Sequence, residues 1–136
     1  IRPSINITSA FNAGTPNTIY QEATPGALTP LPYDFLLWNR DGEPFTDVTI
    51  KTVNPRHSLL MQGNRVVGHV RVDAPRGATG QEVISETPSF PVDSPVLVVP
   101  TARLTAQFRA GSAPGLYVVT FELNGGNSVQ MFVYVE

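Results

Sequence analysis

A chain of 136 residues, of which 41% are hydrophobic, is long enough to bury a core as one domain, and this excludes wholesale disorder. The formal net charge is −2 and only 15% of the residues are charged, so no basic field exists for phosphates and nucleic acid is excluded as a partner. Cysteine is absent, which excludes a disulfide framework, a thiol nucleophile and a thiolate metal site.

The composition also favours short strands over long helices. The chain contains 13 Pro and 11 Gly, and such frequent breakers are typical of many strands joined by turns. No stretch approaches the roughly 20 apolar residues that cross a bilayer, so no membrane insertion is expected. The chain begins at Ile1 instead of methionine, which fits an exported protein without its leader or a module of a longer chain.

Alternation of apolar and polar residues predicts three strands in the first half of the chain. Ile5 and Ile7, with Phe11 as a further member, predict the first strand. A loop that contains Thr15-Pro16 and Thr24-Pro25-Gly26 is expected to follow. Residues 35–38 and 48–52 then read as two strands on either side of a turn at 40–44.

The middle of the chain gives a weaker pattern. Val66, Gly68, Val70 and Val72 share one predicted face, which leaves His69 facing water. His57 follows a proline in an expected turn. Residues 76–95 are rich in turn formers and are expected to form a long loop, and 96–99 form a short strand between prolines. The order of strands in this region stays open.

The C-terminal third gives the clearest alternation. Strands are predicted at 103–109, 117–123 and 129–135, each with one apolar face and one more polar face. The segment 124–127 (Asn-Gly-Gly-Asn) supplies residues that tolerate positive φ, which a tight hairpin requires. Phe108, Val119 and Phe121 are the predicted core residues of these strands.

Two stretches have a recognisable order of strands and turns. Residues 34–50 (DFLLWNRDGEPFTDVTI) have a strand, a turn, a proline and a strand in succession. Residues 104–121 (LTAQFRAGSAPGLYVVTF) are followed by the closing hairpin and the final strand. The first stretch resembles the strand, turn, proline and strand of bacterial immunoglobulin-like repeats of the invasin and adhesin type, and the second resembles the last three strands of those repeats. In that family an Ala-Gly-x-x-Pro-Gly-x-Tyr segment places a tyrosine at a corner, which implies that the Tyr117 hydroxyl bonds to nearby backbone.

The resemblance implies a rigid, non-enzymatic module of surface adhesins, invasin-like proteins or multidomain extracellular chains. We predict one immunoglobulin-like antiparallel β-sandwich of roughly seven to nine strands over residues 1–136, with 55–100 as a lengthened middle segment. The expected location is extracellular or at the cell surface. The expected partners are neighbouring identical subunits or flanking domains, with glycan as a further option.

The residues do not suggest a catalytic centre. His57 and His69 are the two histidines, and no Gly-x-Ser-x-Gly elbow accompanies them, so an enzyme is not expected. Copper binding is the more specific alternative function, because these histidines together with Met61 and Met131 offer imidazole and thioether donors. Solvated histidines and gap-filling methionines explain the same residues more simply, and neither metal nor another cofactor is predicted.

Two further groups of residues are candidate sites. Trp38, Phe132 and Tyr134 could stack on sugar rings, since the last two lie on the strand face opposite the predicted core; the simpler interpretation is that the middle segment or a neighbouring subunit covers this face. The apolar series that begins at Ile1 and continues through the first strand could pair with a sheet edge of a neighbouring subunit and build a filament. The simpler alternative is a first strand folded within its own domain.

Overall fold

The computed structural model of the protein describes residues 5–9, 18–29, 33–39, 48–54, 56–85, 101–125 and 127–136. These ranges contain ten strands and no helix, which confirms the predicted all-β class and exceeds the seven to nine strands expected. The strands are β1 (Ile5–Ser9), β2 (Thr18–Ala23), β3 (Tyr33–Asn39), β4 (Val48–Asn54), β5 (His57–Gln62), β6 (Arg65–Asp73), β7 (Glu82–Ser85), β8 (Thr101–Arg109), β9 (Gly115–Leu123) and β10 (Ser128–Val135).

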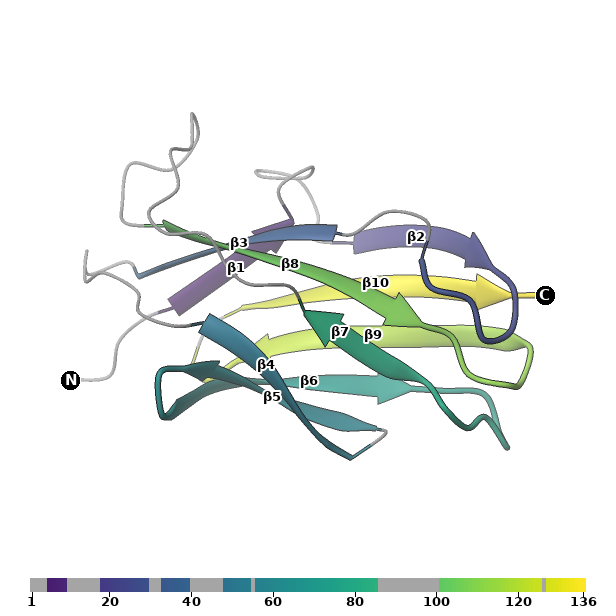
Figure 1. Ribbon diagram of the computed structural model, residues 1–136. Coiled ribbons are helices and arrows are strands. Elements are labelled where there is room, and N and C mark those ends of the chain that lie inside the picture. Colours follow the sequence, from purple (N-terminus) through teal and green to yellow (C-terminus); the bar gives the residue numbers. More distant parts are fainter. Residues whose placement is uncertain are drawn as a thin grey trace.

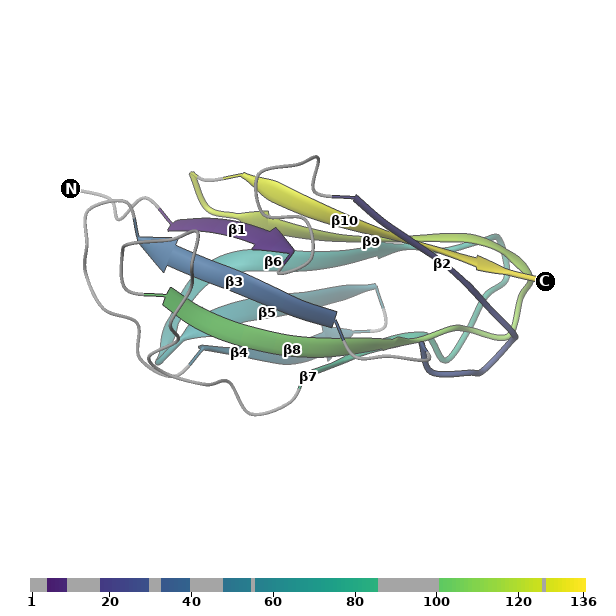
Figure 2. The ribbon, with the colours of Figure 1, turned by 90° about the horizontal axis from the view of Figure 1, so that it is seen from above.

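The strands form the two layers of a sandwich (Figure 1). One sheet has four strands in the order β1-β3-β8-β7, and the other has six in the order β2-β10-β9-β6-β5-β4. Seen from above, the four-stranded sheet lies over the six-stranded one (Figure 2). Neighbouring strands are antiparallel except for β2, which runs parallel to β10.

The strand order agrees in part with an immunoglobulin variable-type domain. Strands β1, β3, β8 and β7 have the neighbour order A, B, E and D, and β10 and β9 take the places of G and F. In a variable-type domain, the strand that follows B lies beside F. In this chain the strand that follows β3 is β4, which lies at the far edge of the six-stranded sheet, and the strand beside β9 is β6. The two-sheet sandwich is therefore confirmed, and an immunoglobulin-like connectivity stays a prediction.

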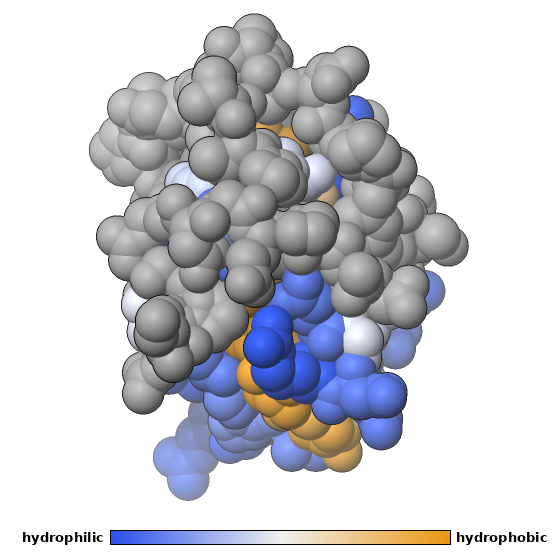
Figure 3. Space-filling view, turned by 90° about the vertical axis from the view of Figure 1, so that its left-hand side faces the viewer, coloured by the Kyte–Doolittle hydropathy of each residue, from blue (hydrophilic) through white to orange (hydrophobic). Residues whose placement is uncertain are grey.

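Apolar side chains fill the space between the sheets. Phe108, Val119 and Phe121 are fully buried, as predicted. The ring of Phe35 on β3 lies 4.6 Å from that of Phe121 on β9, so an aromatic pair joins the two layers at the centre. At the end where β5 turns into β6, the described surface is mainly hydrophilic around a narrow hydrophobic strip (Figure 3).

Strand β2 contradicts the loop predicted after the first strand. Its residues pair with β10 in a parallel register that sets Ile19 opposite Met131 and Ala23 opposite Val135. The hydrogen bonds that make this segment a strand come from the other end of the chain, so the local sequence does not show them. The expected turn at Thr24-Pro25-Gly26 does follow β2, and Gly26 has a φ of 74°.

The middle of the chain holds more strand than predicted. His57 begins β5 where a turn was expected, and β7 lies inside the predicted loop at 76–95. In β6, Val67 is buried in place of Val66, because the register with β5 shifts at this level and an extra residue on β6 reverses the alternation. His69 is exposed, as predicted.

Several expectations fall outside the described residues. They include Ile1 and Phe11 of the first strand, the Thr15-Pro16 part of the first loop, the turn at 40–44, residues 86–95 of the predicted long loop and the strand at 96–99.

Candidate functional site

Strand β1 lies between β3 and the hairpin that joins β9 to β10, and the position that it fills between them is called the groove below. It pairs antiparallel with β3, from Ile5 opposite Asn39 to Ser9 opposite Phe35. Ile5 and Ile7 point into the core and keep 4% and 0% of their surface exposed. The described part of the candidate assembly strand is thus folded into its own sandwich, and Ile1 and Phe11 lie outside the described residues.

The side chain of Asn127 closes the outer edge of β1. Its Oδ1 accepts a hydrogen bond from the Ile7 N–H at 2.8 Å, and its Nδ2 donates one to the Ile7 carbonyl oxygen at 2.7 Å. One amide therefore replaces the pair of bonds that a further strand would make at this residue. The sequence pattern places Asn127 only in a turn, since nothing local connects it with a strand 120 residues away.

The hairpin holds Asn127 in place through its own turn. Gly125 has a φ of 70°, which a residue with a side chain adopts at a cost, so the Asn-Gly pattern serves the turn as predicted. The Leu123 N–H donates to the carbonyl oxygen of Asn127 at 3.2 Å, and the Asn124 N–H donates to that of Val67 at 2.9 Å. The turn is thereby tied to the bulge of β6, and the amide of Asn127 is presented to β1.

The three candidate aromatic residues do not form one surface. Trp38 lies on the side of β3 opposite the buried Leu37, so it belongs to the four-stranded sheet. Phe132 and Tyr134 lie on the outer face of β10 in the six-stranded sheet. The two outer faces are on opposite sides of the sandwich, and a single platform that includes Trp38 is excluded.

An exposed apolar pair marks the outer face of the six-stranded sheet. Tyr134 on β10 lies opposite Leu116 on β9, and these side chains are 42% and 45% exposed. The next pair along the same face is Phe132 opposite Val118, and both are half-buried. Cross-strand pairs of this kind stabilise a sheet, and the first pair is the more exposed of the two.

Charged side chains lie further along the same outer face, where Arg71 is opposite Thr120 and Asp73 is opposite Val118. Arg71 on β6 contacts Asp73 at 3.3 Å and Glu122 at 3.1 Å, and all three side chains are about half exposed. Exposed ion pairs contribute only about 0–1 kcal/mol to stability. Their main effect here is to place donors and acceptors for a polar ligand on the same outer face as Tyr134 and Leu116.

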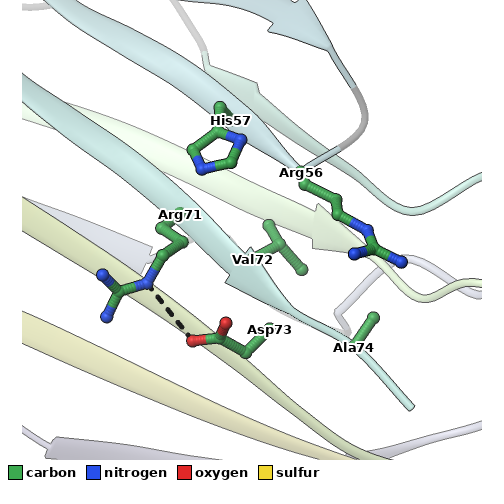
Figure 4. A pocket seen from close by; sticks show the side chains of 6 residues that line it. All are labelled: Arg56, His57, Arg71, Val72, Asp73 and Ala74. Atoms are coloured by element: carbon green, nitrogen blue, oxygen red, sulfur yellow. Dashed lines mark hydrogen bonds and ion pairs between the residues drawn. The ribbon is translucent and has the colours of Figure 1, made fainter. Parts of the chain in front are cut away.

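An open pocket of about 230 Å³ lies beside the end of β6 (Figure 4). The residues that line it are Arg56, His57, Arg71, Val72, Asp73 and Ala74. The Val72 N–H donates to the Arg56 carbonyl oxygen at 3.0 Å, which fixes the start of β5 against β6. Arg71 and Asp73 form an ion pair within the pocket. Since the pocket thus presents charges of both signs, its charge does not define one class of ligand.

The donors of the copper alternative are spread over three strands. Met131 faces the core on β10. His57 and Met61 lie four residues apart on β5, a separation of about 13 Å along a strand, and His69 lies opposite Leu59 between them. Within the described ranges, no group of three His, Cys, Asp or Glu residues could hold a metal ion. The fold does not bring the predicted donors together.

Tyr117 makes the predicted corner bond at the start of β9. Its hydroxyl donates to the Ala113 carbonyl oxygen at 2.5 Å, and its ring lies 5.7 Å from that of Phe108. Burial raises the pKa of the Tyr117 hydroxyl above the ordinary value, although backbone hydrogen bonds act in the opposite direction. The role of this residue is to fix the turn before β9.

Comparisons with protein-family models, curated proteins and solved structures give no match. The resemblance to immunoglobulin-like repeats therefore stays a prediction. In the part of the chain that is described, no helix is long and apolar enough to cross a membrane.

Proposed function

We propose that this chain is a non-enzymatic structural or adhesive module of an extracellular or cell-surface protein. The observation that supports this proposal most directly is the continuous apolar core between the two sheets, which fills the interior and leaves faces and edges for contact. Two packed sheets give a stiff unit, and stiffness is the property that a spacer or adhesive surface needs.

The proposed partners are other protein chains, either neighbouring copies or flanking domains. β4 lies at one end of the six-stranded sheet order, and edge strands are recurrent sites of strand addition. β1 lies at one end of the four-stranded order, where the Asn127 amide already occupies its outer edge at Ile7. In the strongest form of the proposal the module is the repeating subunit of a filament, in which N-terminal strands pass from copy to copy.

Multi-angle light scattering over a concentration series tests this proposal. We expect the mass to rise with concentration as copies associate, and immunolabelling of intact source cells to reveal the chain at the surface. A strictly monomeric chain that turns over a small substrate would contradict the proposal.

Carbohydrate binding is the second candidate, and the exposed pair of Tyr134 and Leu116 favours it. The ring of Tyr134 is open to solvent and can stack on a sugar, and the charged groups of Arg71 and Asp73 lie on the same outer face, two strands away on β6. Affinity electrophoresis on a panel of polysaccharides tests this candidate: a sugar-binding module is retarded and stays monomeric, whereas an assembly module is not retarded.

A further inference from the structure

The contacts that hold β1 do not depend on which copy of the chain supplies the strand. They are main-chain pairing with β3, two apolar side chains in the core, and the bidentate clamp of Asn127 on the main chain of Ile7. Main-chain bonds provide affinity for any extended segment, and pockets for alternate side chains select among segments. This groove selects a strand with apolar residues two positions apart, as Ile5 and Ile7 are.

We propose that the groove between β3 and the β9–β10 hairpin is an acceptor site for β1 of a second copy. This inference rests on the proposed assembly function and names its partner and its contact surface. The donated strand takes the place of the chain's own β1, in the same register with β3 and under the same Asn127 amide.

β1 can leave without breaking the pairing between the other strands. It has five residues, and among the described strands β3 is its one neighbour in the sheet order. When it departs, β3 keeps its pairing with β8, and β2 keeps its pairing with β10 in the other sheet. The segment after β2 also stays in place, because the Ala110 N–H donates to the Ala27 carbonyl oxygen at 2.9 Å.

A vacated groove is unfavourable, and it therefore attracts another strand. Departure of Ile5 and Ile7 exposes apolar core to water, and it leaves the amide of Asn127 without its two protein partners. A second copy of β1 restores every one of these contacts. The exchanged and closed forms thus have the same local contacts. Their free energies differ mainly in entropy, because β1 is tethered to the groove in the closed form and comes from a second chain in the exchanged form.

Concentration decides between the two forms. A tethered strand competes with an effective concentration of the order of 1 mM, so the closed form dominates in dilute solution and exchange appears when copies are crowded, as on a surface. Fully extended, the connection from Ser9 to Thr18 spans about 30 Å. Reciprocal exchange gives a dimer, and head-to-tail exchange that does not close gives a filament.

Disulfide trapping between single-cysteine chains tests the exchange. Asn6 and Trp38 are opposite each other across β1 and β3, and opposite residues of an antiparallel pair lie about 4.5–5.5 Å apart, within the Cα range of a disulfide. The chain has no cysteine of its own, so the background is clean. Chains with Asn6→Cys and Trp38→Cys are mixed, oxidised and separated by mass under denaturing conditions.

The control pair combines Asn6→Cys with Val53→Cys, because Val53 is exposed on β4 in the other sheet. At a chain concentration near 1 mM we expect several-fold more mixed disulfide from Asn6→Cys with Trp38→Cys than from the control pair. An excess of cysteine-free chain should lower this yield. Asn127→Ala in both chains weakens the closed and exchanged forms alike, so it should speed the linking and leave its final extent little changed.

The double variant Asn6→Cys/Trp38→Cys decides the meaning of a negative result. If it closes its own disulfide while the mixed pair links no more than the control pair, the exchange is overturned. Should light scattering still report association in that case, the copies meet through another surface and the proposed structural function stands. If the double variant forms no internal disulfide, β1 does not pair with β3 of its own chain in this register, and the proposed exchange, which uses the same register, is overturned as well.

Discussion

The hydroxyl of Tyr117 donates a hydrogen bond to the carbonyl oxygen of Ala113, 2.5 Å away, and so closes the turn that leads into β9. Tyr117→Phe removes this bond and keeps the buried ring against Phe108. Because one hydrogen bond contributes about 0.5–1.5 kcal/mol net, we expect the free energy of unfolding to fall by about 1 kcal/mol. Urea denaturation followed by circular dichroism measures this loss, and an unchanged midpoint would show that the corner bond contributes nothing.

The same tyrosine gives the stability a dependence on alkaline pH. Burial raises the pKa of the Tyr117 hydroxyl in the folded state above its ordinary value of 10.0. A raised folded pKa contributes stability that is fully present below pH 10 and is lost as the pH rises through the folded pKa. The stability gap between the wild type and Tyr117→Phe should therefore narrow above pH 10, and a constant gap between pH 7 and pH 11 would contradict this account.

Gly68 allows β6 and β9 to approach each other. A Cβ built on this residue would lie 2.5 Å from the carbonyl oxygen of Glu122, which belongs to the backbone and cannot turn aside. Gly68→Ala should lower the free energy of unfolding by about 1–3 kcal/mol, the usual range for overpacking. His69→Ala is the matched control, because His69 is the next residue and its side chain is exposed; equal effects of the two changes would contradict the steric explanation.

Strict alternation explains which strands the sequence could predict. In β10, Val129, Met131, Val133 and Val135 are buried and the residues between them are not, so the period of two is readable. In β5, Leu60 faces the core while Leu59 and Met61 are half-buried on the outer face, so the period is lost. The strand was therefore missed, although its residues are apolar.

Non-local contacts set the remaining limits of prediction. β2 is a strand because it pairs with β10, more than 100 residues later, and the clamp of Asn127 on Ile7 joins the two ends of the chain. The candidate aromatics show the same limit: alternation placed Phe132 and Tyr134 on one face correctly, but only the sheet assignment separates Trp38 from them.

Thr120 and Thr105 form a matched pair that tests how much a threonine hydroxyl contributes to the free energy of unfolding with and without a hydrogen-bond partner. The Oγ1 of Thr120 is buried and has no hydrogen-bond partner in the described structure, whereas the Oγ1 of Thr105 donates to Asp34 Oδ1 at 2.7 Å. Thr120→Val removes an unsatisfied polar group and should stabilise the fold by about 1 kcal/mol, whereas Thr105→Val should destabilise it by about 1–2 kcal/mol. Thermal unfolding compares the two; a loss of stability in both variants would mean that the Thr120 hydroxyl is satisfied in solution.

The opposite positions of Tyr134 and Trp38 make the carbohydrate alternative easy to test. If a polysaccharide binds to the outer face of the six-stranded sheet, Tyr134→Ala should abolish retention in affinity electrophoresis and Trp38→Ala should leave it unchanged. Circular dichroism checks that both variants are folded, because Trp38 also packs against the core. Equal retention of Tyr134→Ala and the wild type would remove this face from consideration.

Asn127 should contribute to stability through both of its bonds to Ile7. Two part-buried hydrogen bonds of about 0.5–1.5 kcal/mol each predict a loss of about 1–3 kcal/mol for Asn127→Ala, measured by chemical denaturation.

Asn127→Asp keeps the acceptor for the Ile7 N–H but sets a carboxylate against the Ile7 carbonyl oxygen, so it should be at least as destabilising at pH 7. Protonation restores a donor, which means that the introduced carboxyl has a pKa above its ordinary value near 4. The stability of Asn127→Asp relative to the wild type should thus recover as the pH falls through that pKa, while the deficit of Asn127→Ala stays constant. A deficit that does not change with pH in the aspartate variant would mean that the side chain at 127 does not bond the Ile7 carbonyl oxygen in solution.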